Sequence, residues 1–118
     1  MSNDQPDSEP WYAVRCIFSH PSRTREKEGN LYEERITLWR AKSWNEAFEL
    51  AREEAKEYEQ EDCVFIKATD AFNLFDEEIK NGTEVWSVMR DSHFDPDLYM
   101  KTFCNSGRER IKPLQPNE

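Results

Sequence analysis

The chain has 118 residues, of which 36% are apolar and 13% aromatic, and its formal net charge at pH 7 is −9. This length suits one domain, and the aromatic content excludes an intrinsically disordered chain, which would be poor in such residues. The negative charge argues against nucleic acids and anionic lipid surfaces as partners, because both attract cationic proteins.

No stretch of the sequence approaches the roughly 20 apolar residues that span a bilayer, and the first ten residues lack the apolar core of a secretion signal. We therefore expect a cytoplasmic protein. Its three cysteines, Cys16, Cys63 and Cys104, are an odd number and widely spaced, which fits thiols in a reducing compartment. We expect residues 1–10 and 113–118 to be flexible tails around a single domain at residues 11–112.

Two strands are predicted near the N-terminus, at residues 11–18 and 31–41, because both segments are rich in aromatic and β-branched residues. The polar segment 19–30 between them predicts a long loop, so the two strands form an antiparallel hairpin. Alternation would place Tyr12, Val14, Cys16 and Phe18 on one face of the first strand.

A helix is predicted from Ser43 to about Gln60. Ser43 and Glu46 have the spacing of a capping box, in which the serine accepts from the Glu46 amide and the glutamate reaches back to the Ser43 amide. An apolar stripe follows at intervals of three and four residues, formed by Trp44, Ala47, Phe48, Ala51, Ala55 and Tyr58.

A third strand is predicted at residues 64–75, with a bulge or break at Asp70, and a fourth at residues 84–90 after the Asn81–Gly82 turn. Asp95 and Pro96 then indicate the start of a short helix at residues 96–103. The predicted fold is α+β: a mostly antiparallel four-stranded sheet with one long helix on one face and a short C-terminal helix, in the order β-β-α-β-β-α.

Several segments resemble the bacterial family catalogued as domain of unknown function 4288 (DUF4288). They are WYAVR at residues 11–15, YEERITLWRA at residues 32–41, the capped helix after Ser43, and GTEVWSVMR at residues 82–90. The resemblance implies a compact bacterial domain. It implies no activity, cofactor or catalytic residue.

Asp91, His93 and Asp95 alternate, so an extended chain would place them on one side as weak candidates for Zn²⁺ or Fe²⁺ ligands. The alternative interpretation, which we favour, is a polar loop in which Asp95 caps the next helix. His20 could pair with a cysteine or carboxylate in nucleophilic catalysis, but chance proximity is the better interpretation. Cys104 is the thiol to test, whereas Cys16 and Cys63 are expected to be small core residues. No phosphate-binding loop or recognised catalytic motif occurs, so we expect no catalytic residue and no cofactor.

Two surfaces are candidates for protein interaction. Glu49, Glu53 and Glu57, followed by Glu61, form an acidic line along the helix, which is either a solvated face or a docking edge for a basic partner. The second sheet face would carry large apolar residues interleaved with polar ones: Trp11, Ile17, Trp39 and either Trp86 or Met89, with Arg15, Arg35 and Thr37. Either this face is an interface, or the segment with Leu98, Tyr99, Met100 and Phe103 covers it.

The leading hypothesis is a non-enzymatic interaction or regulatory module that self-associates through this face. The first alternative is an immunity or inhibitor protein that binds a basic toxin or nuclease by charge complementarity. The second alternative is a metal- or thiol-dependent enzyme that uses Asp91, His93 and Asp95, or Cys104.

Overall fold

A computed structural model describes residues 9–24 and 29–111 of the chain. The chain divides into two compact units, Met1–Ser87 and Val88–Glu118, which are described separately below. Apart from Glu9 and Pro10, the expected tails lie outside the described residues. The single domain expected at residues 11–112 stays a prediction.

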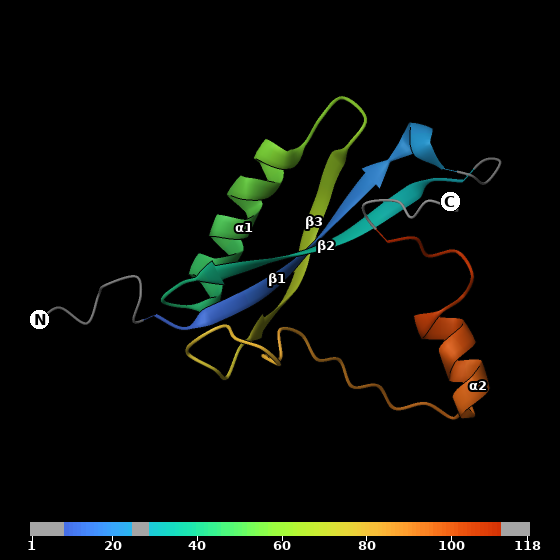
Figure 1. The fold of residues 1–118 in the computed structure, drawn as a ribbon. Helices are drawn as coiled ribbons and strands as arrows, with labels where there is room; N and C mark the ends of the chain where they lie inside the picture. Colours follow the sequence, from blue (N-terminus) through green and yellow to red (C-terminus); the bar gives the residue numbers. More distant parts are fainter. Residues whose placement is uncertain (1–8, 25–28, 112–118) are drawn as a thin grey trace, which may run out of the picture. The chain divides into compact units, whose positions relative to one another are not determined.

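The first unit is built on a three-stranded antiparallel sheet in the order β2-β1-β3 (Figure 1). Its strands are β1 (Trp11–His20), β2 (Leu31–Arg40) and β3 (Val64–Asn73). β1 is the central strand and the most buried of the three, which fits its aromatic and β-branched sequence. The predicted hairpin of the first two strands is confirmed, with each residue from Trp11 to His20 opposite one from Arg40 to Leu31.

The predicted fourth strand is wrong, and with it the four-stranded sheet and the β-β-α-β-β-α order. Residues 84–90 have no regular secondary structure. Trp86 instead packs near Phe72, with 6.3 Å between ring centroids, and below the guanidinium of Arg15 at 5.8 Å. Strand propensity mostly measures how well a side chain fits a half-buried surface. Trp86 meets such a surface by packing on side chains of β1 and β3, and not by forming a further strand of the sheet.

One long helix, α1 (Trp44–Tyr58), packs against the sheet, so the α+β class is confirmed (Figure 1). The Ser43 hydroxyl caps it by accepting from the Glu46 amide at 3.1 Å. The return half of the predicted capping box differs, because the Glu46 carboxylate accepts from the amide of Lys42, one residue before the cap, at 2.8 Å. The helix therefore starts where the sequence indicates, with both of these amides bound by side chains.

The core lies between α1 and one face of the sheet. Tyr12, Val14, Cys16 and Phe18 project from β1 toward the helix, and Val14 and Phe18 are fully buried. Ala47, Ala51 and Ala55 form the helix side of this contact. These small side chains let the helix backbone approach closely, and the large aromatic rings fill the remaining space: Phe18 lies 4.9 Å from Tyr58 and 5.5 Å from Phe65 between centroids.

The pairing register corrects the predicted position of three residues, because Thr37, which lies opposite the fully buried Val14, moves to the helix side with Trp39 and Arg35. Trp39 lies opposite Tyr12, and Arg35 lies opposite Cys16. Directly paired residues of an antiparallel sheet point to the same face, so Trp39 and Arg35 lie on the helix side and not on the second face. Trp39 is half-buried against the core.

The expected irregularity near Asp70 is confirmed. Arg15 pairs with Asp70 and Cys16 with Ala68, so β3 carries an extra residue, Thr69, at this point. A bulge of this kind changes the parity of the strand. It leaves Asp70 where its carboxylate accepts two hydrogen bonds from Arg15, at 3.1 and 2.9 Å.

The second unit holds a short α-helix, α2 (Pro96–Tyr99), that continues as a π-helical turn, η3 (Met100–Cys104). The predicted helix at residues 96–103 is thus present with a change of hydrogen-bonding pattern. Asp95 caps it by accepting from the Leu98 amide at 2.9 Å. The guanidinium of Arg90 lies 4.2 Å from the Phe103 ring centroid and donates to the Tyr99 hydroxyl at 2.8 Å, which ties this unit together.

Candidate functional site

The end of β1 carries a histidine that the sheet brings against a glutamate of β2. Nε2 of His20 lies 2.8 Å from Oε1 of Glu33, and only 7% and 11% of the two side chains are exposed. Glu33 lies opposite Phe18, two residues before His20, so both side chains point to the helix side. The sheet register therefore positions an imidazole beside a carboxylate at the end of the core.

Tyr58, in the last turn of α1, holds the same carboxylate from the other side. Its hydroxyl contacts Oε1 of Glu33 at 3.2 Å and Oε2 at 3.0 Å. The guanidinium of Arg35 lies 3.8 Å from the centroid of the Tyr58 ring and donates two hydrogen bonds to Glu54. These bonds to Glu54 raise the pKa of Arg35, so the guanidinium remains cationic over the ring. Glu33 is thus fixed by groups from both the helix and the sheet.

Cys63 reaches this cluster from the connection between α1 and β3. The backbones of Gln60 and Cys63 exchange two hydrogen bonds of 3.0 Å, which close a tight turn, and the Cys63 side chain is buried in the core. One ligating atom each of His20, Glu33 and Cys63 lies within 4.8 Å of the other two. Within the residues that the structure describes, this is the one group of three or more histidine, cysteine or acidic side chains so arranged.

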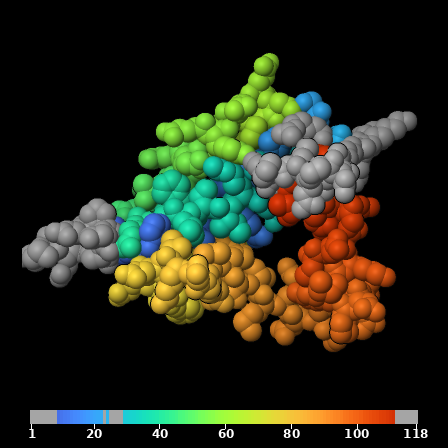
Figure 2. All heavy atoms as spheres, viewed as in Figure 1, coloured from blue at the N-terminus to red at the C-terminus, as the bar shows by residue number. Residues whose placement is uncertain are grey.

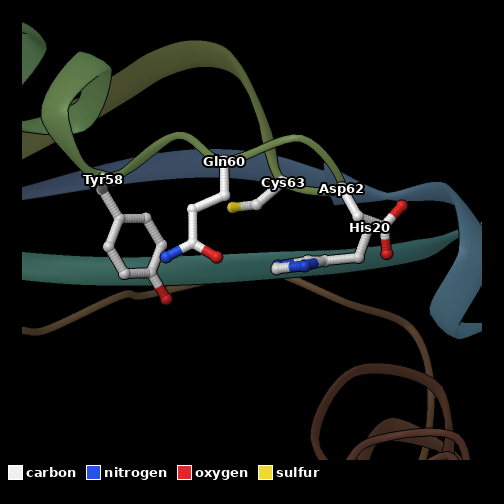
Figure 3. A pocket seen from close by; sticks show the side chains of 5 residues that line it. All are labelled: His20, Tyr58, Gln60, Asp62 and Cys63. Carbon is white, nitrogen blue, oxygen red and sulfur yellow. The ribbon is translucent and has the colours of Figure 1, made fainter.

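A pocket of about 160 Å³ opens beside the cluster, lined by His20, Tyr58, Gln60, Asp62 and Cys63. Figure 3 shows the Tyr58 side chain at the end of α1 and the Gln60 and Cys63 side chains on the connection between α1 and β3, with the His20 ring directed toward them. Asp62 accepts hydrogen bonds from the backbone and hydroxyl of Ser22, which joins the wall of the pocket to the turn after β1. The volume suits water or a few heavy atoms and is below the range of ordinary organic ligand sites.

The cluster has the ligand types of a transition-metal centre: an imidazole, a carboxylate and a thiol. From the sequence, a pairing of His20 with a cysteine or carboxylate is expected only by chance, and Cys63 is expected to be a core residue. The structure brings the two together with Glu33. The parity of His20 with Phe18 is the signal that would place the imidazole on the core side, but we predicted a loop from residue 19, whereas β1 continues to His20.

The predicted interaction residues fall on three surfaces. On the second sheet face, Arg15 contacts Trp86, and Trp11 lies beneath the guanidinium of Arg40 at 4.7 Å. Arg35 and Trp39 are on the helix side, as described above. Glu49, Glu53 and Glu57 are exposed along α1.

The weak metal candidates Asp91, His93 and Asp95 are all exposed in the second unit. Asp95 is the helix cap, and among the described residues these three side chains do not come together as a group of metal ligands. Of the thiols, Cys104 is exposed, while Cys16 and Cys63 are buried; no disulfide links these three described residues. Burial raises the pKa of the Cys16 thiol, and the nearby Glu54 carboxylate adds to this effect.

The described residues of the first unit thus form a small α+β fold, the helix α1 on a three-stranded antiparallel sheet, with a buried polar cluster at one end. The sequence profile of the family described as domain of unknown function (DUF4288) matches residues 11–87, and the chain belongs to that family. The matched range contains the whole sheet, α1 and all three residues of the cluster. No curated protein and no solved structure matches the chain significantly. No helix among the described residues is long and apolar enough to cross a membrane.

Proposed function

We propose that this domain is a protein-interaction module that associates with a second copy of itself through the second face of its sheet. The observation that carries the proposal is the inverted polarity of β2. Tyr32, Ile36 and Leu38 are exposed, whereas the helix side of the strand carries Glu33 and Arg35. A strand with one solvated face usually shows the reverse pattern, with its apolar side chains toward the core.

The exposed apolar side chains of β2 lie on one face of the strand. Ile36 and Leu38 are neighbours on this face, the charged Glu34 separates them from Tyr32, and the half-buried Ile17 lies beside them on β1. In the space-filling view, β2 (teal) contributes to the surface between α1 (green) and the segment after β3 (yellow) (Figure 2). Neighbouring apolar side chains of this kind are typical of interfaces.

A second copy is the occupant that fits best. β2 lies at the edge of the sheet, and a stripe centred on one strand can meet its own copy about a two-fold axis, the commonest symmetry of protein dimers. Trp11, Arg15 and Trp86 lie on the same face and would flank the contact. Trp39 and Arg35, which we predicted in this interface, face the helix instead. Ile36 and Leu38 take their place on the second face.

Light scattering coupled to size-exclusion chromatography tests the proposal. The wild-type chain should elute with twice the 14.1 kDa mass of one chain, and Ile36→Asp should return it to the monomer mass. Ile79→Asp is the matched control, because Ile79 is similarly exposed (45% against 42%) but lies outside the sheet. Its mass should stay dimeric.

The dimer should also strengthen as salt is added. Each copy carries a formal charge of −9, so electrostatic repulsion opposes association at low ionic strength and is screened at high ionic strength. A monomer at every concentration and salt level contradicts self-association. Suppose that this monomer also loses thermal stability on Ile36→Asp but not on Ile79→Asp. The second sheet face is then covered by another part of the same chain. This outcome would favour the alternative in which the segment with Leu98, Tyr99, Met100 and Phe103 packs on that face.

A basic protein partner is the second candidate function, favoured by the exposed carboxylates of Glu49, Glu53 and Glu57. These side chains form no hydrogen bond or ion pair with other described residues, so they are available to a cationic surface. An immunity or inhibitor protein against a basic toxin or nuclease would use them in this way. We place either function in the cytoplasm, where the thiols stay reduced.

Affinity capture at low and high salt separates this candidate from self-association. A basic partner should be retained at low salt and released at high salt, the opposite of the trend expected for the dimer. Charge reversal by Glu53→Lys and Glu57→Lys should abolish its capture, whereas Glu78→Lys and Glu84→Lys, at exposed acids outside the helix, should not. Equal capture by both pairs of variants rules out the acidic face.

A further inference from the structure

We propose that His20, Glu33 and Cys63 bind a zinc ion, with a fourth coordination position open to the adjoining pocket. The three side chains come from the end of β1, from β2 and from the turn before β3, so the folded domain and not a sequence motif assembles them. This site is independent of the dimer proposed above, because it lies on the helix side of the sheet.

The geometry is within reach of tetrahedral coordination. Zinc bonds of about 2.0–2.3 Å to nitrogen, oxygen and sulfur separate the ligand atoms by about 3.3–3.8 Å. The three atoms here lie within 4.8 Å of one another, with His20 and Glu33 at 2.8 Å. Movements of about an ångström, in which the histidine and glutamate part and the thiol approaches, would admit the ion.

The charges of the site match a divalent cation. A neutral imidazole, a carboxylate and a thiolate sum to −2, which Zn²⁺ neutralises. Without a cation, a thiolate beside a nearly buried carboxylate would be strongly unfavourable, since burial penalises unpaired charge. The thiol sulfur favours zinc over magnesium or calcium, which prefer oxygen ligands alone.

The surroundings hold the ligands in place. Tyr58 bonds to both oxygens of Glu33, so its hydroxyl can keep one oxygen while the other binds the metal. Arg35 fixes the Tyr58 ring, and the paired hydrogen bonds of Gln60 and Cys63 fix the backbone that carries the thiol. Such outer contacts orient metal ligands and raise their affinity.

His20 and Cys63 also line the pocket of about 160 Å³, so an ion held by them faces this space. Three protein ligands with an open position are typical of zinc sites that bind water or a small anion, whereas purely structural sites have four protein ligands. The pocket has room for that fourth, exchangeable ligand.

The test is a titration of the full chain, purified with reductant and without chelator, with Co²⁺ as a spectroscopic probe and Zn²⁺ as competitor. We expect one equivalent of Co²⁺ to bind, with the near-ultraviolet charge-transfer band of a thiolate–cobalt bond, and Zn²⁺ to displace it. Affinity should fall at acidic pH, because protons compete for the ligands. A folded wild-type chain that binds no stoichiometric Co²⁺ or Zn²⁺ overturns the proposal.

Variants assign the ligands. Cys63→Ser should remove the charge-transfer band, and His20→Gln should weaken zinc binding by at least about tenfold. Cys104→Ser is the matched control, since Cys104 is an exposed thiol of the second unit, and its titration should equal that of the wild type. A band that survives Cys63→Ser but disappears with Cys104→Ser would show that the exposed thiol binds the metal and would also overturn the proposal.

Tyr58→Phe separates a folding effect from a ligand effect. It leaves all three ligands and removes only the hydroxyl that bonds to Glu33. We expect about a tenfold loss of zinc affinity with the charge-transfer band retained. Circular dichroism without metal shows whether each variant is folded, and an unchanged zinc affinity in a folded Tyr58→Phe chain would contradict the orienting role given to the Tyr58 hydroxyl.

Discussion

Arg35 donates two hydrogen bonds to Glu54, of 2.6 and 2.8 Å, and these bonds join β2 to α1. The pair is bidentate and partly buried, with about a quarter of each side chain exposed. It accounts for a charged residue on the helix side of a strand: the guanidinium finds a carboxylate on α1 and also covers the Tyr58 ring.

Removing one partner of this pair should destabilise the domain. We expect Glu54→Gln to lower the free energy of unfolding by about 1–2 kcal/mol, because it leaves the partly buried Arg35 without its charged acceptor. Glu53→Gln, at the exposed neighbouring position, should change it by less than about 0.5 kcal/mol. Urea unfolding of both variants measures the difference, and equal stabilities would show that the ion pair contributes nothing net.

The Cys16 thiol should make the domain less stable in alkali. Its pKa in the folded chain is raised above the ordinary 9.0, so as pH rises through 9 the unfolded chain loses this proton before the folded chain does. The folded state then binds more protons, and the free energy of unfolding falls with pH.

Urea titrations between pH 7 and 10 check this slope. Cys16→Ala should reduce it, although the smaller side chain lowers stability at every pH. Cys104→Ser, which changes an exposed thiol, should keep the wild-type slope. An identical slope in wild type and Cys16→Ala would refute the assignment.

Ser43 should contribute to helix stability through its cap. Ser43→Ala removes the acceptor of the Glu46 amide and should lower the free energy of unfolding by about 1 kcal/mol. Ser43→Asp keeps an acceptor next to the positive end of the helix dipole and should restore most of this loss. Thermal unfolding followed by circular dichroism measures both, and a Ser43→Asp chain as weak as Ser43→Ala would argue against capping.

Trp86 should stabilise the first unit although it lies outside the sheet. Trp86→Ala removes its contacts with Phe72 and Arg15 and should lower the free energy of unfolding by about 2 kcal/mol. Its exposed neighbour is the control: Val85→Ala should cost less than about 0.5 kcal/mol. Equal effects of the two changes would mean that the Trp86 contacts do not form in solution.

Local patterns in the sequence determined much of this fold. The β1 strand, the Ser43 cap, the stripe of Ala47, Ala51 and Ala55, and the irregularity at Asp70 each follow from neighbours within a few residues. Such features depend on backbone propensity and on alternation, which a chain segment carries with it wherever it packs.

Long-range pairing decided the rest. The same alternation in β2 allows either face to meet the helix, and only its register with β1 placed Arg35 and Trp39 inward and Ile36 and Leu38 outward. The segment at residues 84–90, which we predicted as a strand, has no regular structure, and its Trp86 packs on Phe72 and Arg15 because surface was available there. His20, Glu33 and Cys63 meet only when two strands pair and the chain turns back after α1, so their proximity is a property of the tertiary structure and has no counterpart in their spacing along the sequence.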